Sequence, residues 1–273
     1  MNATFAEYKD KHKGKRVFLI GNGPSLAETD LDLIKDECSF AMNRVSLIYD
    51  KNPGWRPTYY LFSSTNVMPS KPWHREWRKS VREAVSEERT TSFVADKFRG
   101  DIDPRGEFKD IKWFSSMSEI KPDLQGNIHP ACFSTNVVER IDKTGTTMNL
   151  ALQLCYHMGF SEIILVGADL GWTHDTGTKS DPNHFVKDYV AEIIRPEKTN
   201  YQMRNIHSLA LAYFQKDKPE TKFYNASAKS VLDIYPMIDF ESYVNAGQVT
   251  RRPEDEETAK SFWTRPAQYS SLI

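Results

Sequence analysis

The amino-acid sequence predicts a single α/β domain built on a mostly parallel β-sheet with helices on both faces. Two runs carry the prediction, at 16–20 and 162–166, because each is almost wholly apolar and is followed directly by a glycine. Helical stretches alternate with such runs along the chain, and strands joined by helices pair in parallel through right-handed crossovers. A chain of 273 residues is long enough for one large domain.

The first half of the chain is expected to begin the sheet with three strands. The elements expected first are, in order, a strand at 16–20, a helical stretch at about 25–35 and strands at 39–43 and 58–63. Beyond them Trp73, Trp77, Val81 and Val85 recur every four residues, as on the buried face of an amphipathic helix. We interpret the two tryptophans as packing residues rather than as a platform for a sugar ring. Short strands are expected to follow at 91–95 and 111–114.

The second half continues the alternation of helices and strands. A helix is expected at 146–158, and Gly159 stands where a C-terminal glycine cap belongs. The elements expected after it are a strand at 162–166, a helix at about 202–215, a strand at 222–225 and a short helix around Val231. One domain would then span 1–247, with an insertion or lid at about 69–124. The charged, proline-containing stretch 248–273 would form a peripheral tail.

The composition argues against several classes of protein. The net charge is −1, so no overall field favours nucleic acid or an acidic membrane surface. The cysteines Cys38, Cys132 and Cys155 are far apart and odd in number, which argues against a disulfide framework and structural zinc. The polar start and the lack of an apolar run of membrane-spanning length favour the cytoplasm. Attachment to the inner face of a membrane through partners, and a homo-oligomer held by the tail, stay open.

The first candidate site segment is the loop directly after the strand at 16–20. It reads Gly21-Asn22-Gly23-Pro24-Ser25, and its two glycines allow a tight turn and a close approach to a phosphate. Free N–H groups at the start of the next helix favour anions, and two of the side chains add donors. The plainer alternative is an ordinary strand-to-helix turn, because two glycines at this spacing are a weak signal. The proline and serine favour a ligand loop, so all five residues are candidates for nucleotide binding.

The second candidate segment follows the strand at 39–43, at the edge where an open α/β sheet binds its ligand. Asn43 and Arg44 place an amide and a guanidinium after an apolar strand, and both groups suit a nucleotide. The alternative is structural, with Asn43 capping a helix that begins at Arg44.

The third candidate segment precedes the long helix of the second half. Thr144, Gly145, Thr146 and Thr147 offer hydroxyls and amides at a helix N-terminus, which form an anion pocket. Downstream, Asp169 follows the strand at 162–166. Its carboxylate could hold Mg²⁺, a ribose or a sugar hydroxyl, or it could cap the next turn, and these alternatives stay open.

His184 is the best candidate for proton transfer among the seven histidines. It lies in a polar loop beyond Asp169, and a neutral imidazole near physiological pH can take a proton from a hydroxyl. His174 and His207 are its competitors. A surface histidine without a chemical role is the alternative reading.

These segments, taken together, resemble a known group of transferases. The stretch 17–26 is similar to the opening of the bacterial sialyltransferases that use CMP-sialic acid. It is also similar to the opening of the MptE-like family, named after an archaeal 6-hydroxymethylpterin diphosphokinase, which in turn resembles the central domain of the motility-associated glycosyltransferases that modify flagellin. Further matches to the MptE-like pattern lie at 42–44, 56–60, 144–153, 156–169, 181–185 and 223–226. The resemblance covers most of 15–245 and is weakest between 69 and 124.

The resemblance implies a Rossmann-like nucleotide-binding domain with a small lid. In the sialyltransferases the glycine loop and the asparagine after the second strand bind the cytidine nucleotide, and a threonine-containing stretch lies against the donor. The catalytic base is a histidine in the loop after the Gly-x-Asp strand, and His184 is its nearest counterpart here. By this likeness the donor-binding residues would be Gly21, Asn22, Gly23, Ser25, Asn43, Thr144, Gly145 and Thr146.

One departure from the sialyltransferases concerns the leaving phosphate. Those enzymes place tyrosines after the aspartate to hold it, whereas Leu170, a glycine and Trp172 follow Asp169 here. Arg44 or the main chain at Thr146 would then have to stabilise the phosphate. We include Trp172 among the candidate donor-binding residues.

The sequence leaves three functions open. The favoured one is an inverting glycosyltransferase that moves a sugar, expected to be a nonulosonic acid, from a CMP-activated donor to a glycan or protein hydroxyl. His184 would be the base, and no metal or redox cofactor would be required. The second is a diphosphokinase that transfers diphosphate from ATP to a hydroxymethyl group, with Mg²⁺ held by Asp169. The third is a non-catalytic nucleotide-binding scaffold in surface-polysaccharide biosynthesis.

Overall fold

The computed structural model describes residues 1–116, 127–172, 181–189, 196–246 and 273. Within them seven strands form one sheet in the order β5-β4-β3-β2-β1-β6-β7, and every neighbouring pair is parallel. The strands are β1 (Arg16–Ile20), β2 (Ser39–Met42), β3 (Tyr59–Phe62), β4 (Thr91–Ala95), β5 (Ile111–Phe114), β6 (Glu162–Val166) and β7 (Lys222–Asn225). The predicted Rossmann-like α/β fold is therefore confirmed.

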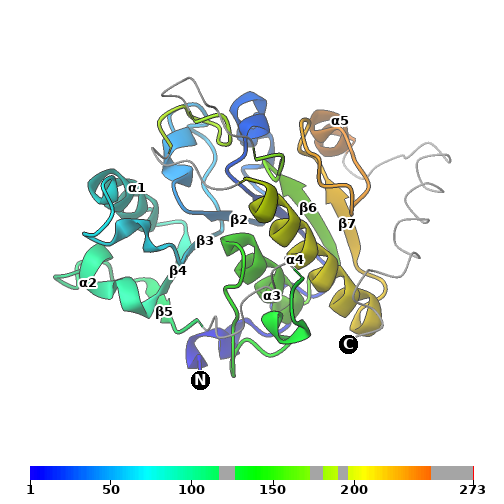
Figure 1. Ribbon diagram of the computed structural model, residues 1–273, viewed down its shortest axis with the longest axis horizontal. Helices are drawn as coiled ribbons and strands as arrows, with labels where there is room; N and C mark the ends of the chain where they lie inside the picture. The colour runs from blue at the N-terminus through cyan, green and yellow to red at the C-terminus, as the bar shows by residue number, and fades with distance from the viewer. Residues whose placement is uncertain (117–126, 173–180, 190–195, 247–272) are drawn as a thin grey trace.

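Helices cover both faces of this sheet (Figure 1). The α-helices are α1 (His74–Val85), α2 (Arg99–Ile102), α3 (Thr147–Met158), α4 (Pro196–Asp217) and α5 (Phe240–Asn245). On one face α3 contacts β1, β2 and β3, and α4 packs against α3. On the other face Phe18 of β1 meets Phe240 of α5, and Phe62 of β3 meets Trp77 of α1, with ring centroids 6.2 and 6.4 Å apart.

The two central strands are the most deeply buried part of the sheet. Val17 to Ile20 in β1 and Ile163 to Val166 in β6 have no exposed surface. Side chains of a strand point alternately to opposite faces, so complete burial requires cover on both sides. This is why both strands could be recognised in the sequence as unbroken apolar runs.

The helical stretch predicted at about 25–35 consists of two 3₁₀ helices, η2 (Pro24–Glu28) and η3 (Leu31–Ile34), rather than one continuous helix. Thr29 adopts an extended conformation that ends the first, and the Asp30 carboxylate accepts a hydrogen bond from the N–H of Asp32 to cap the second. Other 3₁₀ helices are η1 (Ala3–Tyr8), η4 (Val45–Ile48), η5 (Thr65–Val67), η6 (Asp96–Phe98) and η7 (Pro130–Cys132).

The predicted short helix around Val231 is wrong. This segment is a loop held from β7, because the Asn225 side chain donates to the Ser230 hydroxyl and to the Leu232 carbonyl. The N–H of Val231 donates to the Asp169 carbonyl at 2.8 Å. The loop is thereby fastened to the segment that follows β6.

The stretch for which an insertion or lid was expected contributes α1, α2, β4 and β5, and both strands belong to the same sheet. The tail at 248–273 lies outside the described residues except for Ile273, whose carbonyl accepts a hydrogen bond from Lys216. Among the described residues, no helix combines the length and the apolar character that crossing a membrane requires.

Candidate functional site

The strand order creates a crevice at the carboxyl ends of β1 and β6. From β1 the chain proceeds through β2, β3, β4 and β5 on one side, whereas β6 and β7 extend the sheet on the other side. Ligands of open α/β sheets bind at such a switch point, outside the carboxyl ends of the strands. The predicted glycine loop follows β1 and the Gly167–Asp169 segment follows β6, so the fold brings these two predicted segments together.

The two segments approach so closely that only glycine fits at two positions. The N–H of Gly21 donates to the Val166 carbonyl at 2.7 Å, and that of Gly23 to the Gly167 carbonyl at 2.8 Å. A Cβ on Gly21 would lie 2.3 Å from the Gly167 oxygen, and a Cβ on Gly23 would lie 2.2 Å from Oδ2 of Asp169. The glycines are therefore required by backbone contact between the β1 and β6 loops.

Asp169 fastens the two loops to each other. Its Oδ2 accepts a hydrogen bond from the N–H of Ser25 at 2.9 Å, and the side chain is almost completely buried. Burial raises the pKa of the Asp169 carboxyl above its ordinary value, although the hydrogen bonds from Ser25 act in the opposite direction. A carboxylate placed in this way fixes the path of the glycine loop.

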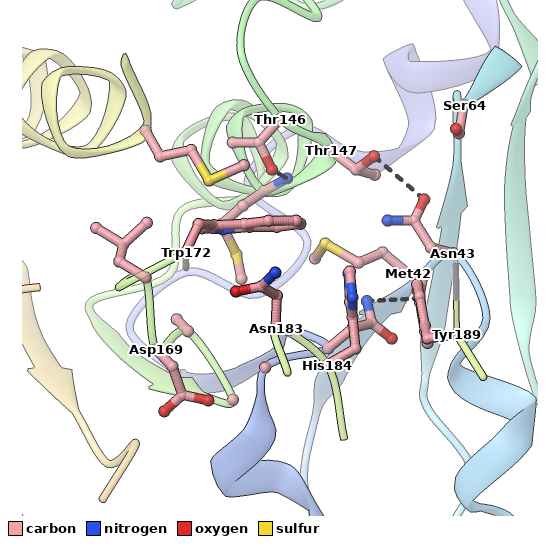
Figure 2. A pocket seen from close by; sticks show the side chains of 18 of the residues that line it. Met42, Asn43, Ser64, Thr146, Thr147, Asp169, Trp172, Asn183, His184 and Tyr189 are labelled. Atoms are coloured by element: carbon pink, nitrogen blue, oxygen red, sulfur yellow. Dashed lines mark hydrogen bonds between the residues drawn. The ribbon is translucent and has the colours of Figure 1, made fainter. Parts of the chain in front are cut away.

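A cavity of about 290 Å³ opens beside these loops. Figure 2 shows Trp172 across the pocket, with Thr146 on one side and Asn183 and His184 on the other. The described residues that line it are Gly21, Asn22, Gly23, Met42, Asn43, Ser64, Asn66, Trp77, Gly145, Thr146, Thr147, Met148, Gly167, Ala168, Asp169, Leu170, Trp172, Asn183, His184, Tyr189, Met203 and His207. Thus most of the sequence-predicted site residues, from all three segments, surround one cavity.

The start of α3 forms one wall of the cavity. Thr146 is the N-cap of this helix, since its hydroxyl accepts a hydrogen bond from the N–H of Met148 at 3.3 Å. The first N–H groups of a 12-residue helix and its dipole favour an anion at this end. Gly145 precedes the cap in a left-handed conformation with φ +80°, which lets the loop turn into the helix.

Asn43 faces this wall from the end of β2. Its backbone is left-handed, with φ 58°, a conformation that asparagine tolerates better than most residues. Its Oδ1 accepts a hydrogen bond from the Thr147 hydroxyl at 3.3 Å, and its carbonyl accepts one from the Tyr60 hydroxyl at 2.6 Å. The Asn43 side-chain amino group lies at the cavity as a donor.

Thr144 is buried behind the cavity, in a polar network that anchors the loop to α3. The Asn149 amide donates to the carbonyls of Thr144 and Asp142 at 3.2 and 3.3 Å. The Gln153 Oε1 accepts from the N–H groups of Ser134 and Asp142, both at 3.0 Å. Thr144 thus acts on the site through the position of the loop rather than as a lining residue.

His184 is held in one orientation beside the cavity. Its Nδ1 lies 2.6 Å from Oδ2 of Asp181, and because a carboxylate accepts, Nδ1 carries the proton. The ring stacks on Tyr189 with centroids 3.9 Å apart and planes 7° apart, and Trp172 packs against it at 5.0 Å and 89°. Within the described residues no hydrogen bond engages Nε2. In a neutral imidazole whose proton is on Nδ1, the lone pair is on Nε2, which can then accept a proton.

Arg44, Pro24 and Ser25 are not among the described residues that line the cavity. The Arg44 guanidinium is buried and donates to the carbonyls of Asp188 and Tyr189 at 3.1 and 2.6 Å. Its Nε and Nη1 are thus bound within the chain, and the contact of Arg44 with a nucleotide stays a prediction.

Of the two competing histidines, His207 lies at the cavity. It belongs to α4, and its Nδ1 lies 3.1 Å from the Tyr235 hydroxyl. Burial lowers the pKa of His207 to about 4, so its ring is neutral near physiological pH. His174 lies outside the described residues.

The sequence did not identify the two residues that hold the His184 ring, Asp181 and Tyr189. Asp181 stands three residues before His184, and that spacing in a polar loop was the available signal. Tyr189 gave no such signal, because its stacking on His184 depends on how the loop folds back. Asn183 and the polar pair Ser64 and Asn66 after β3 also line the cavity without having been predicted.

The arrangement around Asp169 bears on the Mg²⁺ alternative. Among the described residues, no group of three or more His, Cys, Asp or Glu side chains could hold a metal ion. Oδ2 of Asp169 is already bound to the N–H of Ser25. Mg²⁺ is commonly held through one or two carboxylates together with water and substrate phosphates, so Asp169 would contribute at most its other oxygen.

No protein-family model matches the chain, and neither does any curated protein sequence. The Maf glycosyltransferase of Magnetospirillum magneticum AMB-1 matches 95% of this chain over 40% of its own, with 16% identity and a TM-score of 0.51. The α-2,3-sialyltransferase Cst-I of Campylobacter jejuni matches 91% of this chain and 94% of its own, with 14% identity and a TM-score of 0.42. This chain therefore corresponds to less than half of the Maf protein. What this chain and the Maf protein share is the α/β fold.

Proposed function

We propose that this chain is an inverting glycosyltransferase that takes a sugar, a nonulosonic acid, from a CMP-activated donor and places it on a glycan or protein hydroxyl. One observation carries the proposal: His184, whose Nδ1 is bound by Asp181, lines the same cavity as the glycine loop and the start of α3. A base beside a helix N-terminus suits a reaction that removes a proton from one group and releases an anion from another.

In this reaction the acceptor oxygen attacks the anomeric carbon and its proton passes to Nε2 of His184. The bond between that carbon and the phosphate oxygen breaks, its electron pair leaves with the nucleotide monophosphate, and the configuration inverts. Asp181 holds the Nδ1 proton and stabilises the imidazolium that forms. The reaction involves no oxidation or reduction and therefore needs no redox cofactor, and the proposal requires no metal.

The departing phosphate is assigned to the start of α3. Arg44, the other candidate from the sequence, donates to main-chain carbonyls instead. The main-chain N–H of Thr147 and the positive end of the α3 dipole lie at the cavity and can stabilise a developing negative charge. Asn43, whose Oδ1 is bound by Thr147, would contribute its side-chain amino group from the opposite side.

Two lines of support stand beside the geometry. The motifs at the glycine loop, at Asn43 and around His184 resemble those of sialyltransferases and MptE-like proteins. The fold shared with the Maf glycosyltransferase is one that accommodates sugar transfer. The enzyme would meet its donor in the cytoplasm and serve surface-polysaccharide or protein glycosylation, at the inner face of the membrane if its acceptor is membrane-bound.

Ligand binding tests the proposal first, with thermal shifts measured for CMP, CDP, UDP, GDP, AMP and ATP, each with and without Mg²⁺. A ligand at 100 times its Kd adds about 2.7 kcal/mol to the free energy of unfolding. We expect stabilisation by CMP without metal, and its loss in Asn43→Ala. Stabilisation by ATP only with Mg²⁺ would instead favour the diphosphokinase.

Turnover separates the enzyme from a scaffold. With a CMP-linked nonulosonic acid, His184→Gln is expected to lower kcat by about 10²–10⁴-fold while CMP binding is kept. His74→Gln is a matched control, since His74 is a partly buried histidine on α1 whose Nδ1 is also hydrogen bonded and which is not among the cavity-lining residues. Equal rates for wild type and His184→Gln would remove His184 as the base. CMP binding without turnover of any CMP-sugar would favour the non-catalytic scaffold.

A further inference from the structure

The segment 181–189, which carries His184, is docked on the ends of β1 and β2. The N–H of Phe185 donates to the Asn22 carbonyl at 3.1 Å, which ties the segment to the glycine loop. At its end, Asp188 and Tyr189 are bound by Arg44, the second residue after β2. The position of the histidine is therefore coupled to two loops of the nucleotide site.

Arg44 makes the densest set of these contacts. Its Nη1 donates to the carbonyls of Asp188 and Tyr189, and its Nε donates to the Ser80 hydroxyl of α1 at 3.2 Å. Its main-chain N–H donates to the Tyr189 hydroxyl at 3.2 Å, and the guanidinium carbon lies 5.5 Å from the centre of the Tyr189 ring. A guanidinium is costly to bury, so the two hydrogen bonds from its Nη1 to one short segment point to a role in holding that segment.

Tyr189 connects Arg44 to His184, because it contacts both residues. Its side chain is 2% exposed, and one ring face stacks on the His184 imidazole at 3.9 Å. Trp77 of α1 packs edge-on against Tyr189 at 5.6 Å. The imidazole is thus confined by Tyr189 on one face, by Trp172 and by the Asp181 carboxylate at Nδ1.

We propose that Arg44 and Tyr189 are positioning residues that fix the orientation of the His184 ring, so that Nε2 faces the acceptor hydroxyl. This inference rests on the proposed function only in naming what Nε2 does; the fixed orientation itself is a property of the folded chain. It also assigns Arg44 a purpose other than contact with the nucleotide.

The first experiment measures the stack directly, without any turnover. Ring protons of His184, assigned by comparison with His184→Gln, should show upfield ring-current shifts in the NMR spectrum of the wild type. We expect these shifts to persist in Tyr189→Phe, which keeps the stacked ring, and to disappear in Tyr189→Leu and Arg44→Met. Arg56→Met is the matched control, because Arg56 also donates to two main-chain carbonyls and lies over a tyrosine ring, that of Tyr49.

The second experiment is a double-mutant cycle on the rate. Arg44→Met is expected to lower kcat by about 10- to 100-fold with the Kd of CMP unchanged, as for a base displaced by about 1 Å. In the His184→Gln background the same substitution should have no further effect, since there is no base left to position. A purely structural role would reduce the rate in both backgrounds.

Each outcome decides the inference. Persistent ring-current shifts in Arg44→Met and Tyr189→Leu would overturn it, as would equal rate losses with and without His184. Loss of CMP binding in Arg44→Met would overturn it too and return Arg44 to the nucleotide. Failure of the proposed function is distinguishable, because it would show as absent turnover in the wild type while the NMR shifts still report whether Arg44 holds the ring.

Discussion

Replacing Gly23 by alanine tests how tightly the β1 and β6 loops are joined. Gly23 has φ −71° and ψ 167°, which alanine adopts freely, so the substitution introduces no backbone strain. The added Cβ would lie 2.2 Å from Oδ2 of Asp169 and 2.8 Å from the Gly167 carbonyl oxygen. One of the loops must move, and the hydrogen bond from Ser25 to Asp169 is the contact that lies in the way.

The cost of Gly23→Ala follows from these contacts. Loss of a buried hydrogen bond to a charged group costs about 1.5–3 kcal/mol. Displacing packed main chain adds about 1–3 kcal/mol to this cost. Alanine also makes the unfolded chain less flexible than glycine does, which offsets about 0.4–1 kcal/mol of the cost. We therefore expect the free energy of unfolding to fall by roughly 2–5 kcal/mol.

Urea unfolding measures this change in the free energy of unfolding, and two further variants test its cause. Gly100→Ala is the control, because a Cβ on Gly100 meets no atom within 4 Å. It should be neutral or stabilising by up to about 1 kcal/mol. In an Asp169→Ala background, where the carboxylate is gone, Gly23→Ala should cost less than in the wild type. A Gly23→Ala protein within about 0.5 kcal/mol of the wild type would refute the steric reasoning, since that is the size of an ordinary surface substitution.

Two further predictions concern the walls of the site. Gln153→Leu leaves the buried N–H groups of Ser134 and Asp142 without their acceptor. It should lower the free energy of unfolding by roughly 2–5 kcal/mol in urea titrations, and an unchanged midpoint would contradict the network. Because burial lowers the pKa of His207 to about 4 from 6.5, the unfolded chain binds more protons between these values. Stability should therefore fall as the pH drops from 6.5 toward 4, and His207→Leu should flatten that dependence; an identical pH profile would exclude His207 as its source.

The sheet could be predicted from the sequence because its strands are buried on both faces. The expected strands at 16–20, 91–95, 111–114, 162–166 and 222–225 have the bounds found in the structure. Burial did not reveal that the helical stretch at 25–35 is divided in two. Its apolar spacing suits a helix, and only the extended backbone at Thr29, with Asp30 bound to its own local N–H groups, divides it.

Candidate residues at strand ends were easier to predict than the direction of their side chains. Asn43 and Arg44 are neighbours after β2, yet Asn43 lines the cavity whereas Arg44 contacts Ser80 of α1. The left-handed backbone at Asn43 separates them, and no pattern of residue types reports that turn. Similarly, His184 could be named from its loop, but its stacking on Tyr189 depends on tertiary contacts.

The glycine loop after β1 and Asp169 after β6 form one structural unit. Gly23 leaves the space that the Asp169 carboxylate fills, and that carboxylate takes the N–H of Ser25, a donor that a phosphate-binding loop would offer to its ligand. A buried carboxylate also repels a second anion placed beside it. Under the proposed function, the nucleoside would therefore lie along the glycine loop and its phosphate at the start of α3. There Thr146 and Thr147 line the same cavity, and the helix dipole favours negative charge.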